Sequence, residues 1–148
     1  MNKINLKTVG SDAEMFLKNI NTNEIISAEG YVKGSKYEPF YYDPSDPYAS
    51  TQLDNVLAEI TIRPATKVDE FADGLINAIN YLKSILPNGI IPVALPAANL
   101  DEKYLMTENA QLFGCEPDFS AYEMRINHKP WSDDYTLRSA GKIACQPI

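Results

Sequence analysis

Residues 52–64 read QLDNVLAEITIRP. Valine, leucine, isoleucine and threonine dominate this segment, which predicts a β-strand at the centre of the fold. Side chains alternate between the two faces of a strand. One face is apolar after its first residue and is assigned to the core: Asp54, Val56, Ala58, Ile60 and Ile62. The other face takes Leu53, Asn55, Leu57, Glu59, Thr61 and Arg63. Such a mixture of polar groups is typical of a cleft lining, although an ordinary half-exposed sheet explains it equally well.

The overall composition is that of a globular, acidic protein. The chain has 148 residues, of which 45% are hydrophobic, and its net charge is −7 with an isoelectric point near 4.6. This length predicts a single domain, residues 1–148, with enough buried surface for a core. The charge argues against direct binding to nucleic acid, whose phosphates attract lysine and arginine. It permits a basic protein partner, and it equally permits solubility alone.

Few residues offer redox or transition-metal chemistry. Cys115 and Cys145 form neither a C-x-x-C pair nor a disulfide framework, which favours a reduced, cytoplasmic protein. His128 is the single histidine, so a multi-histidine zinc site is excluded, while Mg²⁺ held by carboxylates stays open. The N-terminus has no apolar run of signal-peptide length, and no stretch approaches the roughly 20 apolar residues of a membrane helix. We therefore expect no membrane association.

A strand is also predicted at residues 8–18, TVGSDAEMFLK. Alternation places Asp12, Glu14 and Phe16 on one face, and Ala13, Met15 and Leu17 on the other. Two carboxylates on one face of a strand repel each other unless a cation or a base lies between them, which is a second hint of a metal cleft. Alternatively, residues 10–12 form a turn and Asp12 only caps it.

A hairpin and a glycine-rich loop are predicted next. Residues 19–23 read as a turn, and residues 24–28 are expected to pair back on the preceding strand. The loop 30–39, GYVKGSKYEP, brings Lys33 and Lys36 into an acidic chain and could hold an anion such as phosphate. It lacks the Walker pattern, so a plain glycine-rich hairpin loop remains the alternative.

Tyrosines are concentrated in residues 40–48, FYYDPSDPY, which read as an extended segment and a turn. Tyr41, Tyr42 and Tyr48 are candidate partner-binding residues, because tyrosine is enriched at protein interfaces. The alternative is that these rings cover the core.

The clearest helix is predicted at residues 67–86. Its apolar residues follow spacings of three and four: Val68, Phe71, Leu75, Ile79, Leu82 and Leu86. Thr66 with Asp69 resembles a capping box at the start, and Pro87 to Gly89 end the helix. A long amphipathic helix after strands of mixed polarity predicts an α+β fold, with a mainly antiparallel sheet and the helix packed on one face. Shorter elements follow: strands at residues 90–95, 121–126 and 136–144, and a brief helix at residues 101–108.

Five motifs, in order, resemble those of one family: GSDAEMFL, GYVKGSK, LDNVLAEITIRPA, FGCEPDF and LRSAG. They look like the phage-type carboxylate–amine ligases, or amidoligases, which are relatives of glutamine synthetase and glutamate–cysteine ligase. The motifs span residues 9–141. The resemblance implies a glutamine-synthetase-like sheet whose concave face holds ATP and Mg²⁺. It also implies that a carboxylate is activated as an acyl phosphate, which an amine then attacks.

The resemblance also assigns roles to individual residues. Glu14 and Glu59 match the acidic motif positions of the family and are the expected Mg²⁺ ligands. Asp12 and Asn55 match neighbouring positions and would join them directly or through water. Such carboxylates suit phosphoryl transfer, because they hold the cations that neutralise charge developing on phosphate oxygens.

Two basic residues complete the expected site, and the sequence departs from the family after them. Lys36 matches the basic residue of the glycine loop, and Arg138 the arginine of the last motif; both are expected to bind phosphate or a substrate carboxylate. In the family, a strand bearing histidines follows this motif, whereas KIACQPI follows here and His128 lies upstream. Loss of several members of a cooperative site predicts impaired or absent catalysis.

Several readings therefore stay open. One is an impaired amidoligase-like protein with a partial Mg²⁺–ATP site, and another is an active ligase completed by a second subunit. A third is a non-catalytic acidic protein that binds a basic partner, for example a phage inhibitor of a host defence protein in the host cytoplasm. A decaying gene product that still folds is a fourth. A sheet cut short at Ala144 would leave an open edge, which predicts a homodimer.

Overall fold

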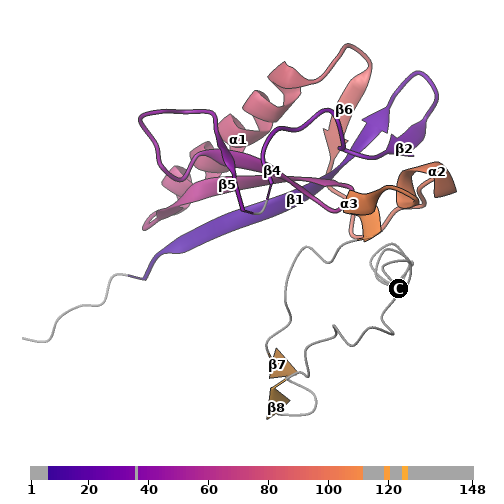
Figure 1. Cartoon of the computed structure of the whole chain (residues 1–148). Coiled ribbons are helices and arrows are strands. Elements are labelled where there is room, and N and C mark those ends of the chain that lie inside the picture. Colours follow the sequence, from indigo (N-terminus) through magenta and orange to yellow (C-terminus); the bar gives the residue numbers. More distant parts are fainter. Residues whose placement is uncertain (1–6, 36, 112–118, 121–124, 127–148) are drawn as a thin grey trace, which may run out of the picture.

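The structure, a computed structural model, describes residues 7–35, 37–111, 119–120 and 125–126. It is an α+β fold in which an antiparallel sheet carries a helix on one face, as the sequence predicts (Figure 1). The strands of the main sheet are β1 (Val9–Asn19), β2 (Glu24–Ile26), β3 (Phe40–Tyr41), β4 (Ser50–Asp54), β5 (Leu57–Ala65) and β6 (Ile90–Val93). The helices are α1 (Val68–Ile85), α2 (Glu102–Leu105) and α3 (Glu108–Gln111). A separate pair of strands is formed by β7 (Phe119–Ser120) and β8 (Arg125–Ile126).

The sheet is organised around β1, its longest strand. The strand order is β2-β1-β5-β4-β3, and β6 also pairs with β1. The first part of β1 pairs with β5, and its last residues pair with β2 and β6, all in antiparallel register. The predicted strand at residues 8–18 and the hairpin that follows it are thus confirmed.

Residues 52–64 form a hairpin, so the prediction of one continuous strand is wrong. β4 ends at Asp54, β5 begins at Leu57, and the two residues between them make the turn. Asn55 takes a φ of 58° there, a left-handed conformation that asparagine adopts more readily than most residues. The turn moves Asp54 out of the predicted core face, because Asp54 now pairs with Leu57. Within β5 the predicted core face is confirmed and is made of Ala58, Ile60 and Ile62.

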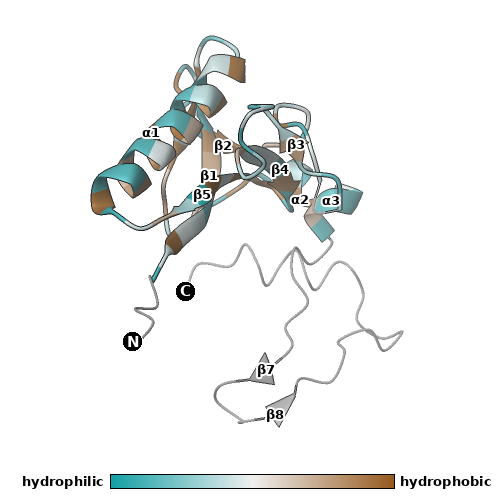
Figure 2. Ribbon diagram, turned by 90° about the vertical axis from the view of Figure 1, so that its left-hand side faces the viewer, coloured by the Kyte–Doolittle hydropathy of each residue, from teal (hydrophilic) through white to brown (hydrophobic). Residues whose placement is uncertain are grey.

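The core lies between the sheet and α1. Leu17, Ile60 and Leu82 are fully buried in it. The helix approaches β5 so closely that a Cβ added to Gly74 would lie 3.5 Å from the Ile62 side chain. Figure 2 shows α1 along one side of the sheet, with hydrophilic residues (teal) over much of its length. The opposite face of the sheet is therefore the one that remains for the polar side chains.

The beginning of α1 differs from the prediction. Lys67 is the N-cap residue, and no side chain caps the helix. The carboxylate of Glu70, rather than that of Asp69, contacts the preceding turn: it accepts hydrogen bonds from the Thr66 backbone N and Oγ1, both at 3.4 Å. Val68 is 82% exposed, so the buried stripe of the helix starts later than predicted, at the half-buried Phe71.

The glycine-rich loop packs against β4. Gly34 has a φ of 93°, and a Cβ at this position would collide with the carbonyl oxygen of Thr51. Glycine is therefore needed for the close approach of two backbone segments of this chain. Lys33 Nζ lies 5.2 Å from the centroid of the Phe40 ring, while Lys36 lies outside the described residues.

The remaining predictions are met in part. The strand predicted at residues 90–95 is β6, and it is less buried than expected, since Ile91 is 39% exposed. Within the helix predicted at residues 101–108, residues 102–105 form α2, and a second short helix, α3, begins at residue 108. The predicted strand at 136–144 and four candidate residues lie outside the described part of the chain: Cys115, His128, Arg138 and Cys145. Among the described residues, no helix is long and apolar enough to cross a membrane.

Candidate functional site

Three adjacent strands place acidic side chains on the face of the sheet opposite α1. Glu14 of β1 is the direct cross-strand partner of Glu59 of β5. Glu59 in turn pairs with Gln52 of β4, and Asp54 lies two residues further along β4 on the same face. The hairpin turn at residues 55–56 is what brings Asp54 to this face. We call Glu14, Asp54 and Glu59 the acidic triad.

The carboxylates of the acidic triad are close together. One carboxylate oxygen from each residue lies within 4.8 Å of the other two. The three differ in accessibility: Glu59 is only 8% exposed, Asp54 is half-buried and Glu14 is exposed. Gln52 Nε2 donates a hydrogen bond of 2.8 Å to Glu59 Oε2, which orients the innermost carboxylate.

Burial, together with the nearby negative charges, raises the pKa of two of these carboxylates. Burial raises the pKa of Glu59 above its ordinary value, the hydrogen bond from Gln52 lowers it, and the charges of Asp54, Asp12 and Glu14 raise it further. Burial also raises the pKa of Glu14, with additional contributions from Asp54 and Asp12. Like charges that face each other across a pair of strands destabilise a sheet. A cation between the carboxylates would remove this repulsion.

The donor set fits a hard divalent cation. Mg²⁺ and Ca²⁺ take oxygen ligands, and Mg²⁺ is commonly held by one or two carboxylates while water or phosphate oxygens complete its coordination. The acidic triad offers three carboxylates, one of them buried and two reachable from solvent.

The sequence-predicted ligands are only partly brought together. Glu14 and Glu59 lie in the triad, whereas Asp12 lies beside it on β1, near enough for its charge to raise the pKa of both glutamates. Asn55 lies in the hairpin turn. Asp54 was missed, because a continuous strand would have turned it toward the core. The Asp-Asn dipeptide at residues 54–55, a common turn sequence, was the signal that could have revealed it.

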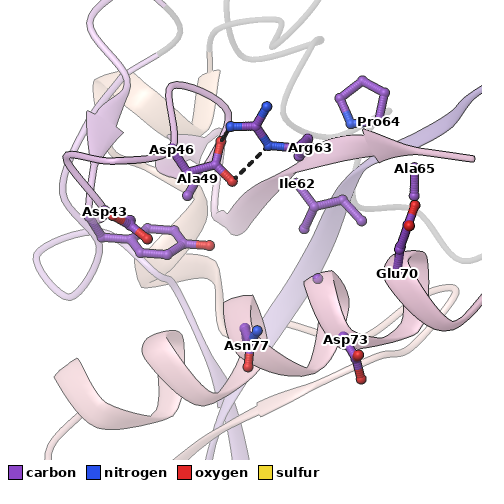
Figure 3. A pocket seen from close by; sticks show the side chains of 12 residues that line it. Asp43, Asp46, Ala49, Ile62, Arg63, Pro64, Ala65, Glu70, Asp73 and Asn77 are labelled. Carbon is purple, nitrogen blue, oxygen red and sulfur yellow. Dashed lines mark hydrogen bonds and ion pairs between the residues drawn. The ribbon is translucent and has the colours of Figure 1, made fainter.

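A second polar region lies at the other side of the sheet, between α1, the end of β5 and the loop after β3 (Figure 3). It is a cavity of about 410 Å³ lined by twelve residues: Tyr42, Asp43, Asp46, Ala49, Ile62, Arg63, Pro64, Ala65, Glu70, Asp73, Gly74 and Asn77. Figure 3 shows Arg63 facing Asp46 across its upper part, and Arg63 Nη2 lies 2.9 Å from Asp46 Oδ1. Four of the lining residues are acidic and one is basic, so the cavity is negatively charged.

The three tyrosines predicted to bind a partner lie in different environments. Tyr42 stacks on Tyr81 of α1, with ring centroids 4.1 Å apart and an interplanar angle of 13°. Burial raises the pKa of Tyr42, and the nearby Asp46 and Asp43 raise it further. Tyr41 and Tyr48 are 52% and 45% exposed. Tyr42 therefore helps to attach the loop to α1, and the other two rings remain accessible.

Comparisons of the chain with protein-family models, with curated proteins and with solved structures found no match. The resemblance to the carboxylate–amine ligases therefore rests on the sequence motifs alone. The geometry of the two polar regions is the remaining basis for a proposal.

Proposed function

We propose that the protein binds a divalent cation, Mg²⁺ in the cell, at the acidic triad, and that this cation holds the phosphates of a nucleotide such as ATP. The observation that carries the proposal is the convergence of three carboxylate oxygens from three strands within 4.8 Å of one another. A sheet without a ligand on this face would be more stable with fewer charges there. The arrangement therefore has a cost in stability that a bound cation would offset.

The nucleotide part of the proposal comes from the resemblance to the carboxylate–amine ligases. In such enzymes the cation neutralises charge on the transferred phosphoryl group. The acidic triad would supply the cation ligands, and Asp12 would act through water. Whether ligase chemistry follows depends on groups outside the described residues, so the proposal concerns binding. A cytoplasmic location, the compartment where Mg²⁺–ATP is abundant, is part of the same proposal.

Calorimetric titration of the EDTA-treated protein tests both steps. Titrating MgCl₂, and then Mg²⁺–ATP, should give binding that disappears in a Glu14→Gln, Glu59→Gln double variant. A matched control is Glu38→Gln with Glu108→Gln, which removes two exposed carboxylates outside the triad. If Mg²⁺ binds but the later addition of Mg²⁺–ATP gives no further binding, the cation site is supported and nucleotide binding is refuted. Equal heats in both double variants would refute the cation site as well.

The second candidate function is binding of a basic protein partner at the cavity beside α1. It is favoured by the four acidic residues that line the cavity, together with the exposed rings of Tyr41 at the end of β3 and Tyr48 on the loop that follows. Tyrosine is enriched at protein interfaces, and complementary charge accelerates association. In this case the protein would act as a binding module and the triad would be dispensable.

This second candidate is tested with a short lysine peptide as the probe. Binding measured by fluorescence anisotropy should weaken in an Asp73→Asn, Tyr48→Ser variant and stay unchanged in Glu59→Gln. Asp73 is exposed and lies on the wall of the cavity formed by α1, as Figure 3 shows. Affinity that is insensitive to Asp73 and Tyr48 would exclude this surface.

A further inference from the structure

The first half of β1 has an open edge. Residues 9–15 pair with β5 on one side, while β6 pairs only from Phe16 and β2 only from Leu17. Within the described part of the chain, no strand pairs with the other side of residues 9–15. In an antiparallel strand, about every second residue directs its backbone N–H and C=O toward a given side. Among the described residues, the backbone groups on this side of residues 9–15 therefore have no partner strand.

The open edge of β1 is longer than the other edge strands of the described sheet. The strands β3, β2 and β6 have only two, three and four residues, and short edge strands are poor templates for pairing. β1 has eleven residues. Its open stretch is thus the longest surface in the described sheet to which another strand could be added.

The side chains beside this edge define what such a strand would look like. Asp12 and Glu14 are exposed on the polar face, while Ala13 lies on the opposite face and packs against the core. A strand added here would meet two carboxylates on one face and an apolar surface on the other. An alternation of basic and apolar residues is complementary to both faces.

A second copy of this chain is a poorer occupant. If two copies of β1 paired around a two-fold axis perpendicular to the sheet, the polar faces would lie on the same side. Asp12 and Glu14 of one copy would then lie next to the same carboxylates of the other, and like charges on neighbouring strands are destabilising. The charges therefore oppose self-pairing and favour a basic partner.

We infer that the edge of β1 at residues 9–15 binds an extended basic segment of a partner protein, which adds to the sheet as a further strand. Main-chain hydrogen bonds would supply affinity, and the residues facing Asp12 and Glu14 would supply specificity. This surface differs from the cavity beside α1, and the inference requires no cation at the acidic triad.

The test uses two peptides that carry the same charge. The probe is acetyl-KVKVKVK-amide, and the control is acetyl-KPKPKPK-amide, which keeps four lysines but cannot pair as a strand because proline has no N–H. Both are titrated in EDTA. The probe should bind at least about tenfold more tightly than the control. It should also slow hydrogen exchange of those backbone amides of residues 9–15 that point away from β5.

A charge-reversed variant tests the role of the polar face. Asp12→Lys should weaken binding of the valine peptide about tenfold. Glu38→Lys changes the net charge equally but lies on the loop beside β4, away from β1, and should have little effect. Rescue of the Asp12→Lys variant by acetyl-EVEVEVE-amide would give independent support, because it restores complementarity with reversed signs.

Each alternative outcome would overturn the inference. Equal binding of the two peptides would mean that a basic partner is held by charge alone and not by strand addition. Exchange protection confined to residues 40–48 would assign the peptide to that tyrosine-rich segment instead. Slow exchange, in the protein by itself, of the amides of residues 9–15 that point away from β5 would mean that the edge is already covered, by a second copy or by another part of the chain. No binding of either peptide would refute a basic partner as well.

Discussion

Replacing Glu59 with glutamine should stabilise the protein in the absence of divalent cations. Glu59 is the least exposed member of the acidic triad, and its carboxylate has two others close by. Glutamine has nearly the same shape and its Oε1 can still accept the hydrogen bond that Gln52 Nε2 donates to the glutamate. The substitution therefore removes a charge and keeps the packing. Its effect on the free energy of unfolding therefore measures how much the charge repulsion within the acidic triad destabilises the fold.

The magnitude follows from the separation of the charges. Two unit charges at 4.8 Å, the upper limit of these separations, repel by about 0.9 kcal/mol at a dielectric constant of 80, and by about 3.5 kcal/mol at 20. Glu14 is exposed and Asp54 half-buried, so solvent screens most of the interaction and the lower value applies to each pair. Removing both pairs should raise the free energy of unfolding by about 1–2 kcal/mol at pH 7, which corresponds to about 2–8 °C in Tm.

The increase in the free energy of unfolding caused by Glu59→Gln should grow with pH. The pKa of Glu59 and that of Glu14 are both raised above the ordinary value of 4.5, so the folded state holds these protons more tightly than the unfolded state. Their contribution to stability is present below the unfolded pKa and is lost as the pH rises through the folded pKa values. The difference between Glu59→Gln and the unsubstituted protein should therefore be largest at pH 7 and shrink toward pH 4.

Urea unfolding, followed by tyrosine fluorescence or circular dichroism, measures these differences. It is run in EDTA, in MgCl₂, and in NaCl of matched ionic strength. Mg²⁺ should stabilise the unsubstituted protein and leave Glu59→Gln unchanged, and the exposed control Glu38→Gln should stay within about 0.5 kcal/mol of the parent. A Glu59→Gln protein that is less stable than the parent in EDTA would refute the reasoning, because the triad would then be held by interactions that outweigh its repulsion.

Three further substitutions test the fold. Gly34→Ala should lower the free energy of unfolding in urea by about 2–4 kcal/mol, because its Cβ would collide with β4 and its φ is 93°. Gly30 has a φ of 82° but lies in open space, so Gly30→Ala should lower it by only about 1 kcal/mol. Equal losses would argue against close packing of the loop. Leu82→Ala should lower the free energy of unfolding by about 2–5 kcal/mol in the same measurement, since Leu82 is a fully buried residue of α1 that packs in the core. A loss below 1 kcal/mol would mean that α1 does not cover the sheet. Tyr81→Leu should remove about 0.5–1.5 kcal/mol by ending the stack on Tyr42, and an unchanged midpoint would contradict the stack.

The sequence predicted the parts of the fold that depend on periodicity. Alternation in β1 separated Asp12 and Glu14 from the buried Met15 and Leu17, and the structure confirms this separation. The helix after residue 67 was predicted from spacings of three and four. Both patterns arise because a regular backbone repeats its side-chain directions, and repetition over ten or more residues is visible without tertiary information.

The hairpin between β4 and β5 could not be found in the same way. A two-residue turn leaves alternation intact on each side but reverses the chain, and the usual markers, glycine and proline, are absent from residues 52–62. The turn instead depends on a single asparagine at positive φ. This one conformational choice decides whether Asp54 points into the core or toward Glu59, so the composition of the candidate site could be predicted only in part.

The same hairpin explains why charge accumulates on one face of this sheet. A continuous strand would have placed one acidic residue opposite β1, whereas folding back adds β4 and its Asp54 to the same face. A hairpin register shifted by one residue would turn Asp54 and Gln52 toward the core, where an unpaired carboxylate is far more costly than on a solvated face. The register that buries Ile60 and Ile62 is therefore also the register that gathers the triad. Core packing thus fixes the positions of the three carboxylates, and their mutual repulsion is tolerated because the buried apolar face outweighs it.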